Sequence, residues 1–436
     1  MTLDGPEAGR ATPPPTRSEA AIAAYQARLR PWRRVYAIAI AVAIVAGVVL
    51  VKIAYSHGEI SHARLKTAAS AAPSVALTGP SSTLTQAWAS SDHTAIGTPY
   101  WHGTVVTFST HGVNGRDALT GAVRWSYTRS DRIVCQAAQV QGITVAVFEL
   151  RGNCDELTAL NSGTGARQWN RTLDEDSHAV DGQPSYATAP YTFMVTTPDV
   201  IFAIDPISGY DRWLFAQQGC KINGSVLGSA GALISQTCTT PSCAGVKFCG
   251  RGPQLLLRDG ITGQEDDSSK NHGNPDQIKW NLIGNTSMPV SADSVISAAE
   301  HGSTQLTVLD AAKGKTLSTL TLSAPIGGAT SALQTARAEL IHTGAITYAI
   351  TADGTGVTWR APSTALPTVT ATDKAATPDL TRAIIAVGSS DGIELLDGRD
   401  GSLARTFPVA APAAGSQVYA FGSGFLVTGS STIGYR

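Results

Sequence analysis

A short motif returns along most of this sequence and constrains what the chain can fold into. It starts with Asp or Asn, has Gly four residues later and, in its clearest copies, has Trp eight residues after the start. Successive motif glycines lie 44, 44, 54, 51, 42 and 45 residues apart. A repeat of this length indicates an array of similar structural units. Clear copies occupy residues 117–125, 161–169 and 205–213, and looser ones start at Asp259, Asp310, Asp353 and Asp397.

Each copy has the residue types of a tight turn between two strands. The Asp or Asn side chain can accept hydrogen bonds from backbone amides two residues on, and Gly supplies a left-handed conformation. The Trp can pack its ring against the neighbouring unit. Four short strands per repeat predict the blade of a β-propeller. The residues assigned to this structural role are Asp117, Gly121, Trp125, Asn161, Gly165, Trp169, Asp205, Gly209, Trp213, Asp259, Gly263, Asp310, Gly314, Asp397 and Gly401.

The two ends of the repeat region supply complementary parts of one blade. Residues 84–88, which end in Trp88, have the pattern of a fourth strand without the three that should precede it. Pairing the two ends would close the ring and leave no free sheet edge. We therefore predict an all-β fold, an eight-bladed propeller over residues 84–436, or a seven-bladed one if the degenerate unit at 352–359 is not a blade. The three unmatched strands at the far end are residues 417–420, 424–427 and 432–435.

An uncharged apolar segment precedes the repeats. Residues 35–51 carry no charge and Lys52 can extend to the interface, so residues 35–55 are long enough to cross a bilayer as a helix. Arginines at 28, 30, 33 and 34 place the N-terminus in the cytoplasm by the positive-inside rule. A cleaved signal peptide is the alternative, but the stretch before the apolar run is long for one. We predict a disordered cytoplasmic tail (1–34), a transmembrane helix (35–55), an extracytoplasmic linker (56–83) and the propeller outside the cell membrane.

All six cysteines follow the apolar segment. An even number on one side of a predicted anchor suits disulfides in an oxidising compartment. Order along the chain favours consecutive pairs, and a loop pinned by the last pair is a candidate recognition element. A zinc site built from the last four is the alternative, although the sequence has no CxxC pair. The disulfide candidates are Cys135, Cys154, Cys220, Cys238, Cys243 and Cys249.

The charge balance argues against nucleic-acid binding. The chain has 32 basic and 33 acidic residues, which give a formal net charge of -1. Charged residues make up only 15% of it, and no basic stripe could neutralise a run of phosphates. The expected partners are therefore the membrane and another protein of the envelope.

The pattern Asp-x-x-Thr-Gly-x-x-x-Trp, clearest at residues 117–125, resembles the pyrroloquinoline-quinone (PQQ) type of propeller repeat. The resemblance covers about residues 84–436 and is loose in the last four copies. Quinoprotein dehydrogenases of that superfamily bind PQQ and calcium at the propeller's centre. Relatives such as the outer-membrane assembly lipoprotein BamB use the same blades as a non-enzymatic scaffold. The single anchor with a short tail is similar to that of membrane-anchored actinobacterial propellers.

Several departures from the dehydrogenase pattern favour the scaffold. The sequence has no adjacent Cys-Cys pair, which many quinoprotein alcohol dehydrogenases carry under the cofactor. A G-x-S-x-G match at 388–392 lies between two strands, which is not the setting of a hydrolase nucleophile. The acidic runs at 174–176 and 265–267 lack the spacing of a calcium loop. We expect no catalytic residue, no metal and no cofactor in a membrane-anchored binding or scaffold module; the alternatives are a PQQ- and calcium-dependent oxidoreductase or a small-ligand sensor.

Overall fold

A computed structural model of the protein contains two compact units, Met1–His62 and Ala63–Arg436. Each unit is described by itself. The structure describes residues 21, 35–36, 38–47, 59–75, 81–98, 100–150, 152–173, 184–228, 231–239, 251–264, 270–271, 280–283, 295–300, 302–310, 316–326, 331–334, 338–351, 353–370 and 384–436.

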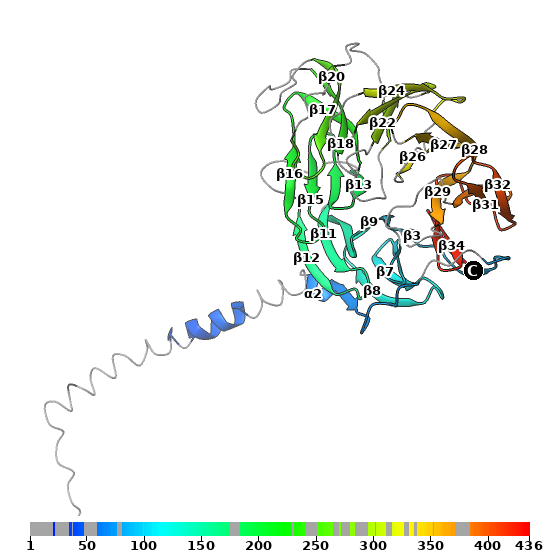
Figure 1. The fold of residues 1–436 in the computed structure, drawn as a ribbon. Coiled ribbons are helices and arrows are strands. Elements are labelled where there is room, and N and C mark those ends of the chain that lie inside the picture. Colours follow the sequence, from blue (N-terminus) through cyan, green and yellow to red (C-terminus); the bar gives the residue numbers. More distant parts are fainter. Residues whose placement is uncertain are drawn as a thin grey trace, which may run out of the picture. The chain divides into compact units, whose positions relative to one another are not determined.

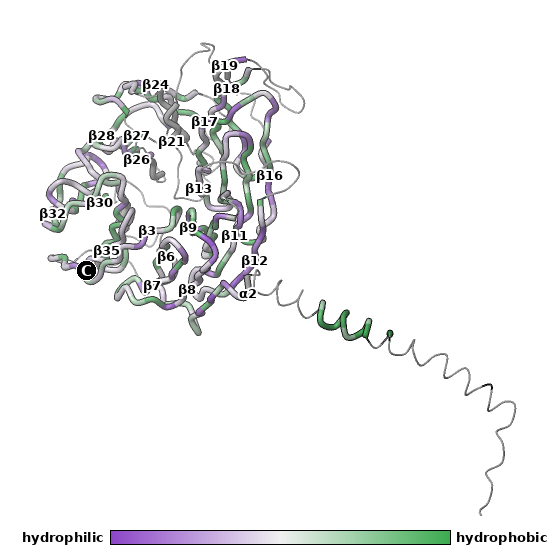
Figure 2. Tube along the Cα trace, turned by 180° about the vertical axis from the view of Figure 1, so that it is seen from behind, coloured by the Kyte–Doolittle hydropathy of each residue, from purple (hydrophilic) through white to green (hydrophobic). Residues whose placement is uncertain are grey.

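The first unit contains the apolar segment. The described residues of this segment, 35–36 and 38–47, are helical, and Figure 2 shows the stretch 38–47 as strongly hydrophobic. A short helix, α2, covers Glu59–His62. Within the residues described, no helix combines the length and the apolar character needed to cross a bilayer. The remainder of the predicted span lies outside the described residues.

The second unit is a β-propeller whose antiparallel sheets are arranged around a common centre (Figure 1). From the outer to the inner edge, the first sheet contains β1 (Ala63–Lys66), β8 (Val123–Arg129), β7 (Gly112–Asp117), β6 (Thr104–Ser109) and β3 (His93–Thr94), and β5 (Tyr100–Trp101) also pairs with β6. The second contains β12 (Arg167–Thr172), β11 (Asn153–Asn161), β10 (Ile143–Leu150), β9 (Val134–Val140) and β4 (Ile96–Gly97). The third contains β16 (Asp211–Phe215), β15 (Ile201–Ile204), β14 (Thr192–Thr196) and β13 (Ser185–Ala189).

The remaining sheets follow in chain order. The fourth contains β20 (Lys270–Asn271), β19 (Gly252–Asp259), β18 (Gly231–Cys238) and β17 (Cys220–Leu227). The fifth contains β24 (Thr316–Thr321), β23 (Gln305–Asp310), β22 (Val295–Glu300) and β21 (Trp280–Ile283). The sixth contains β28 (Val357–Pro362), β27 (Ile346–Thr351), β26 (Ala338–His342) and β25 (Ser331–Gln334). The seventh contains β32 (Leu403–Phe407), β31 (Gly392–Asp397), β30 (Ile384–Ser389), β29 (Ala365–Thr370), β33 (Gln417–Phe421), β34 (Gly424–Thr428), β35 (Thr432–Tyr435) and β2 (Gln86–Ser90).

The number of blades differs from the main prediction. The described strands form seven hydrogen-bonded sheets rather than eight, so by this criterion the propeller has seven blades. The reason is a parallel pairing between Leu366 on β29 and Gln417 on β33, which joins two groups of four strands into one sheet. The degenerate unit at 352–359 belongs to the sixth sheet, which stands alone. The count of seven therefore arises from a merger and not from the loss of that unit.

The predicted closure of the ring is confirmed. β2 pairs antiparallel with β35, and Trp88 lies opposite Gly434. Thr85 and Arg436 exchange two backbone hydrogen bonds of 2.8 and 3.0 Å. Within the seventh sheet, one strand from the start of the propeller therefore completes a group of four with the last three strands of the chain.

The repeated motif forms the turn into the outer strand of a sheet. In the first copy, Asp117 Oδ1 accepts hydrogen bonds from the amides of Leu119 and Thr120, both at 3.0 Å. The Gly121 amide donates to Asp117 O at 2.8 Å, and Gly121 has a φ of 71°. The turn therefore needs both an acceptor side chain and a residue that tolerates positive φ. The side chains of Asn161, Asp205 and Asp259 accept the same pair of hydrogen bonds from backbone amides.

Each motif tryptophan docks on the motif turn of the next sheet. Trp125 is fully buried, and its indole N–H donates to Ser162 O at 2.8 Å. A side chain added at Gly165 would meet the Trp125 ring atoms at 2.8 Å, so glycine is needed there for a second reason. In every such pair the acceptor directly follows the motif Asp or Asn: Trp88 donates to Ala118, Trp125 to Ser162, Trp169 to Pro206, Trp213 to Gly260 and Trp359 to Gly398.

The turn of the sixth sheet uses a different register from the one predicted. Thr351 takes the first position of the motif, because its amide donates to Gly356 O at 3.0 Å, five residues on. The residue predicted to start the motif, Asp353, lies inside the turn. On β24 of the preceding sheet, Ser318 occupies the position of the tryptophan and donates a hydrogen bond to Gly354 O.

Residues 63–75, which fall in the predicted linker 56–83, are bound to the propeller. β1 pairs antiparallel with β8, so that Ala63 lies opposite Arg129. Beyond β1, the Ala68 amide donates to Thr164 O at 2.9 Å, and Ala72 is buried. We call residues 63–75 the strap. Glycines provide its space, since a side chain at Gly103 would meet Ala72 and Pro73, and one at Gly163 would meet Ala71.

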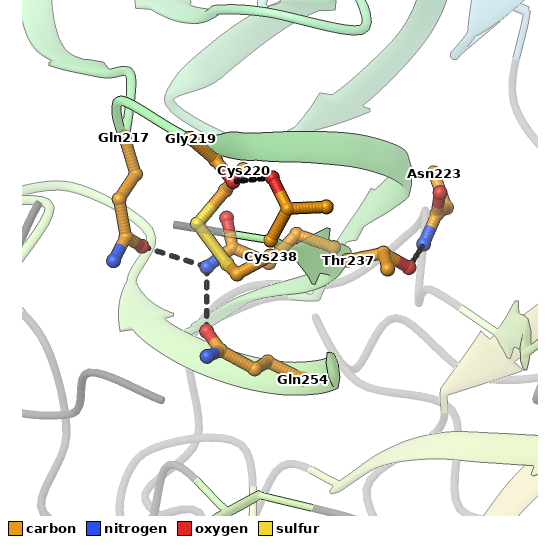
Figure 3. The surroundings of a disulfide bond; sticks show 9 residues. Gln217, Gly219, Cys220, Asn223, Thr237, Cys238 and Gln254 are labelled. Carbon is orange, nitrogen blue, oxygen red and sulfur yellow. Dashed lines mark hydrogen bonds between the residues drawn. A yellow bond between two sulfur atoms is a disulfide. The ribbon is translucent and has the colours of Figure 1, made fainter. Parts of the chain in front are cut away.

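Two of the expected disulfides are present, Cys135–Cys154 and Cys220–Cys238. The second joins β17 to β18, where the two cysteines lie directly opposite each other. Figure 3 shows Gln217 and Gln254 beside it; the buried Gln236 amide donates to their side-chain oxygens at 2.7 and 2.8 Å. Cys243, Cys249 and the loop they were expected to pin lie outside the described residues.

The tryptophan contact can be tested at its glycine. We expect Gly165→Ala to lower the free energy of unfolding by about 3 kcal/mol, because the new methyl group combines backbone strain with a clash against the Trp125 ring. Gly415→Ala is the matched control: Gly415 also has a positive φ, 78°, but a side chain there would meet nothing within 4 Å. It should cost only about 1 kcal/mol. Urea unfolding followed by tryptophan fluorescence measures both, and equal losses would contradict the role assigned to the ring.

Candidate interaction surface

The motif turns place a variable side chain on the surface at a fixed position. The residue two places after the motif Asp is Leu119 in the first sheet, Ile207 in the third and Ile261 in the fourth, and all three are exposed. The hydrogen bonds of the turn use only the backbone at this position. The repeat therefore fixes where this side chain projects and leaves its chemistry free.

Several exposed apolar side chains lie on turns of the third and fourth sheets. Tyr191 lies between β13 and β14, Ile207 and Tyr210 lie in the third motif turn, and Ile261 lies in the fourth. Their exposed fractions are 43, 59, 78 and 41%. We call these four residues the apolar patch.

Hydrogen bonds hold the three turns of the apolar patch together. Arg212 on β16 donates to Tyr191 O at 2.7 Å. This bond ties the turn between β13 and β14 to the strand that follows the third motif turn. Thr192 Oγ1 and the Trp213 indole both donate to Gly260 O, at 3.0 and 3.3 Å, and thereby fix the fourth motif turn against the third sheet. The side chains of the patch are thus carried on a backbone that the core already orders.

The arginines next to the apolar patch are paired with acids. Arg212 contacts Asp205 at 2.8 Å, and Arg171 of the second sheet contacts Asp211 at 2.9 Å. Arg171 also donates to Gly209 O at 2.7 Å, which ties the second sheet to the third motif turn. Because these charges are neutralised locally, apolar contact is the main chemistry that the patch offers to a partner.

A buried ion network joins the first and second sheets. Arg129 on β8 donates to both oxygens of Asp131, at 3.0 and 3.1 Å, and to Glu156. Arg132 pairs with the other oxygen of Glu156 at 3.0 Å. Desolvation alone would lower the pKa of Arg129, but the hydrogen bonds to Asp131 and Glu156 raise it above its ordinary value. All four carboxylate oxygens are engaged, so the network is a structural cross-link rather than a reactive site.

Inner strands of the second and seventh sheets meet. β4 pairs in parallel with β9, and Tyr419 on β33 donates to Gly97 O at 3.4 Å. Gln139 on β9 is fully buried, and neither atom of its side-chain amide has a hydrogen-bond partner among the described residues. A buried amide in that state favours a polar ligand or an ordered water. This is therefore the place at which the quinone alternative is best tested.

The structure places the remaining sequence candidates as follows. The G-x-S-x-G match joins β30 to β31, the strand–turn–strand setting expected for a structural turn. Asp310 ends β23, whereas Gly314 and both acidic runs lie outside the described residues. In the part of the chain that is described, no three His, Cys, Asp or Glu side chains gather as a metal site would require. Sequence reasoning missed the apolar patch; the signal that could have found it is an aliphatic residue two places after the motif Asp.

Comparison with known proteins supports the repeat assignment. Residues 74–235 match the family model described as outer membrane protein assembly factor BamB. Residues 74–235 therefore carry PQQ-like propeller repeats. The resemblance predicted from the motif is confirmed over these residues, which include the first three copies. No curated protein matches the chain.

Solved structures similar to this PQQ-like propeller share little sequence with it. The computationally designed Ika8 protein is 12% identical, covers 79% of this chain and 100% of its own, and has a TM-score of 0.50. BamB from Moraxella catarrhalis is 17% identical over 81% of this chain and 100% of its own, with a TM-score of 0.48. Quinohemoprotein alcohol dehydrogenase from Comamonas testosteroni is 13% identical over 81% and 76%, with a TM-score of 0.47. At such identities the likeness to Ika8 shows the fold alone.

A buried histidine should make the propeller sensitive to acid. His342 is 1% exposed, its Nδ1 lies 3.0 Å from Ser363 Oγ, and burial lowers its pKa from 6.5 to about 4. Between these pH values the unfolded chain binds a proton that the folded chain does not, so stability falls as the pH drops from about 6.5 to about 4. The loss should reach up to about 3 kcal/mol. Urea unfolding of His342→Gln across this range should show a shallower pH dependence than the parent; an unchanged slope would contradict the assignment.

Proposed function

We propose that this protein is anchored in the cell membrane by residues 35–55 and presents its propeller outside the cell as a non-catalytic binding or scaffold module. The apolar patch is the observation that carries the binding role. Aromatic and aliphatic side chains that are exposed together on an ordered backbone are typical of protein interfaces. The match of residues 74–235 to a propeller family named for an assembly factor supports the same choice.

The orientation proposed for the chain rests on the sequence and on the disulfides. Two disulfides in the propeller suit an oxidising compartment, and the arginines before residue 35 favour a cytoplasmic N-terminus. Alkaline carbonate should leave the protein in the membrane, and protease added to spheroplasts should digest the propeller. Release by carbonate, or protection of the propeller from protease, would contradict this arrangement.

The binding role predicts a partner at the apolar patch. A photo-crosslinking residue at Tyr210 should give adducts of discrete mass in cells, because a partner that covers the patch must contact its most exposed side chain. The same probe at Leu403, which is 59% exposed on β32 of the seventh sheet, is the matched control and should give few adducts. Ile207→Ser with Tyr210→Ser should abolish the complex on blue-native gels while urea unfolding stays nearly unchanged. Equal adducts at both positions would contradict a specific site.

The oxidoreductase alternative has a test of its own. The purified protein is incubated with PQQ and calcium, and both the absorbance of bound quinone and dye-coupled alcohol or glucose oxidation are measured. We expect neither. Bound quinone that Gln139→Ala releases, together with activity, would replace the scaffold role by quinone-dependent catalysis.

A further inference from the structure

β1 is the outermost strand of the first sheet and presents basic side chains at that edge. It pairs with β8 on one side only in the described structure, so its other edge is open. Arg64, Leu65 and Lys66 are all exposed, and the exposed fraction of Leu65 is 45%. Alternation along a strand places Arg64 and Lys66 on one face of the sheet and Leu65 on the other.

The strap holds β1 in a fixed place on the propeller. Arg124 donates to Ser70 O at 2.9 Å, and Ala68 bonds to Thr164 of the second sheet. Ala72 is buried against Gly103. Any tension or restraint applied to the chain before Ala63 is therefore transmitted to the outer edge of the first sheet.

Only a short piece of chain separates β1 from the proposed anchor. Seven residues, 56–62, lie between Tyr55 and Ala63. Even fully extended, this piece spans about 28 Å. A folded unit of this size is roughly 50 Å across. Whatever the tilt of the propeller, β1 stays within reach of the bilayer surface. The outer strands of distant sheets are under no such constraint and can lie far from it.

We propose that Arg64, Leu65 and Lys66 form a membrane contact that takes the headgroups of anionic phospholipids. The inference rests on the proposed membrane anchor. Two basic side chains on one face of this edge attract anionic headgroups, and Leu65 on the opposite face of the same edge can enter the interfacial region. The contact orients the propeller with the edge of its first sheet towards the bilayer. Charged residues on an edge strand also prevent pairing with other chains, and this role in solution is the competing explanation.

Lipid crosslinking in nanodiscs separates the two explanations. The full-length chain is reconstituted in nanodiscs of phosphatidylcholine with or without phosphatidylglycerol, with benzoylphenylalanine at position 65, 214 or 403. Leu214 on β16 and Leu403 on β32 are matched controls, because they are 43 and 59% exposed on outer strands of other sheets. Lipid adducts are measured by mass spectrometry. A parallel carbonate wash of cell membranes reports whether the anchor is inserted.

We expect adducts at position 65 at least about fivefold above both controls in discs that contain phosphatidylglycerol. R64Q with K66Q should lower the yield at position 65 to about that of the controls, because the two charges supply the attraction to anionic headgroups. Equal adduct yields at the three positions would overturn the membrane contact while leaving the anchor intact. The same holds if the yield at position 65 is unchanged in the variant that lacks the two charges. Release of the chain by carbonate would overturn the anchor and the contact together.

Discussion

The contact between each motif tryptophan and the next motif turn is the constraint on which this propeller depends. It joins three requirements in one place: an indole donor, a carbonyl directly after the motif Asp or Asn, and a glycine under the ring. A blade buries its ring only if its neighbour supplies the turn, so no blade is complete by itself. The link from Trp88 to Ala118 at 2.9 Å joins the last sheet to the first and applies the same rule across the closure.

Features that depend on short-range chemistry could be predicted from the sequence. The Asp, Gly and Trp spacing determined the turns, because an acceptor side chain, a positive φ and a large ring each have few substitutes. The unmatched strands at the two ends predicted the pairing of β2 with β35, since an open sheet edge is unfavourable. The first two disulfides follow from the order of the cysteines.

Features that depend on single long-range contacts could not be predicted. One parallel pair, Leu366 with Gln417, decides whether the eight strands of the seventh sheet count as one sheet or two. The strap binds because Gly103 and Gly163 lack side chains at two surface positions far apart in sequence, and isolated glycines give no periodic signal. The apolar patch draws on three turns between residues 191 and 261, and only the fold brings these turns together through the hydrogen bonds of Arg212, Thr192 and Trp213. In the sixth sheet, Thr351 can start the turn although it is not an Asp. The hydrogen bond from its backbone N–H to Gly356 O keeps the backbone conformation of the motif.

The strap and the apolar patch make different uses of equivalent surfaces. In the first two sheets, glycines on the turns admit a segment of the chain itself. In the third and fourth sheets, Tyr191 and Ile261 stand at the corresponding turns and project outwards. One repeated scaffold thus carries an internal attachment at one side and exposed apolar side chains further round the ring.

The pairing of β2 with β35 has a consequence for biosynthesis. The hydrogen-bonded residues Thr85 and Arg436 are 351 positions apart, so nearly the whole chain must be synthesised before the ring can be sealed. Until then the nascent polypeptide exposes an unpaired strand on either side of the gap, and such strands favour aggregation. Trp88 and its strand must therefore stay shielded until the final strands arrive.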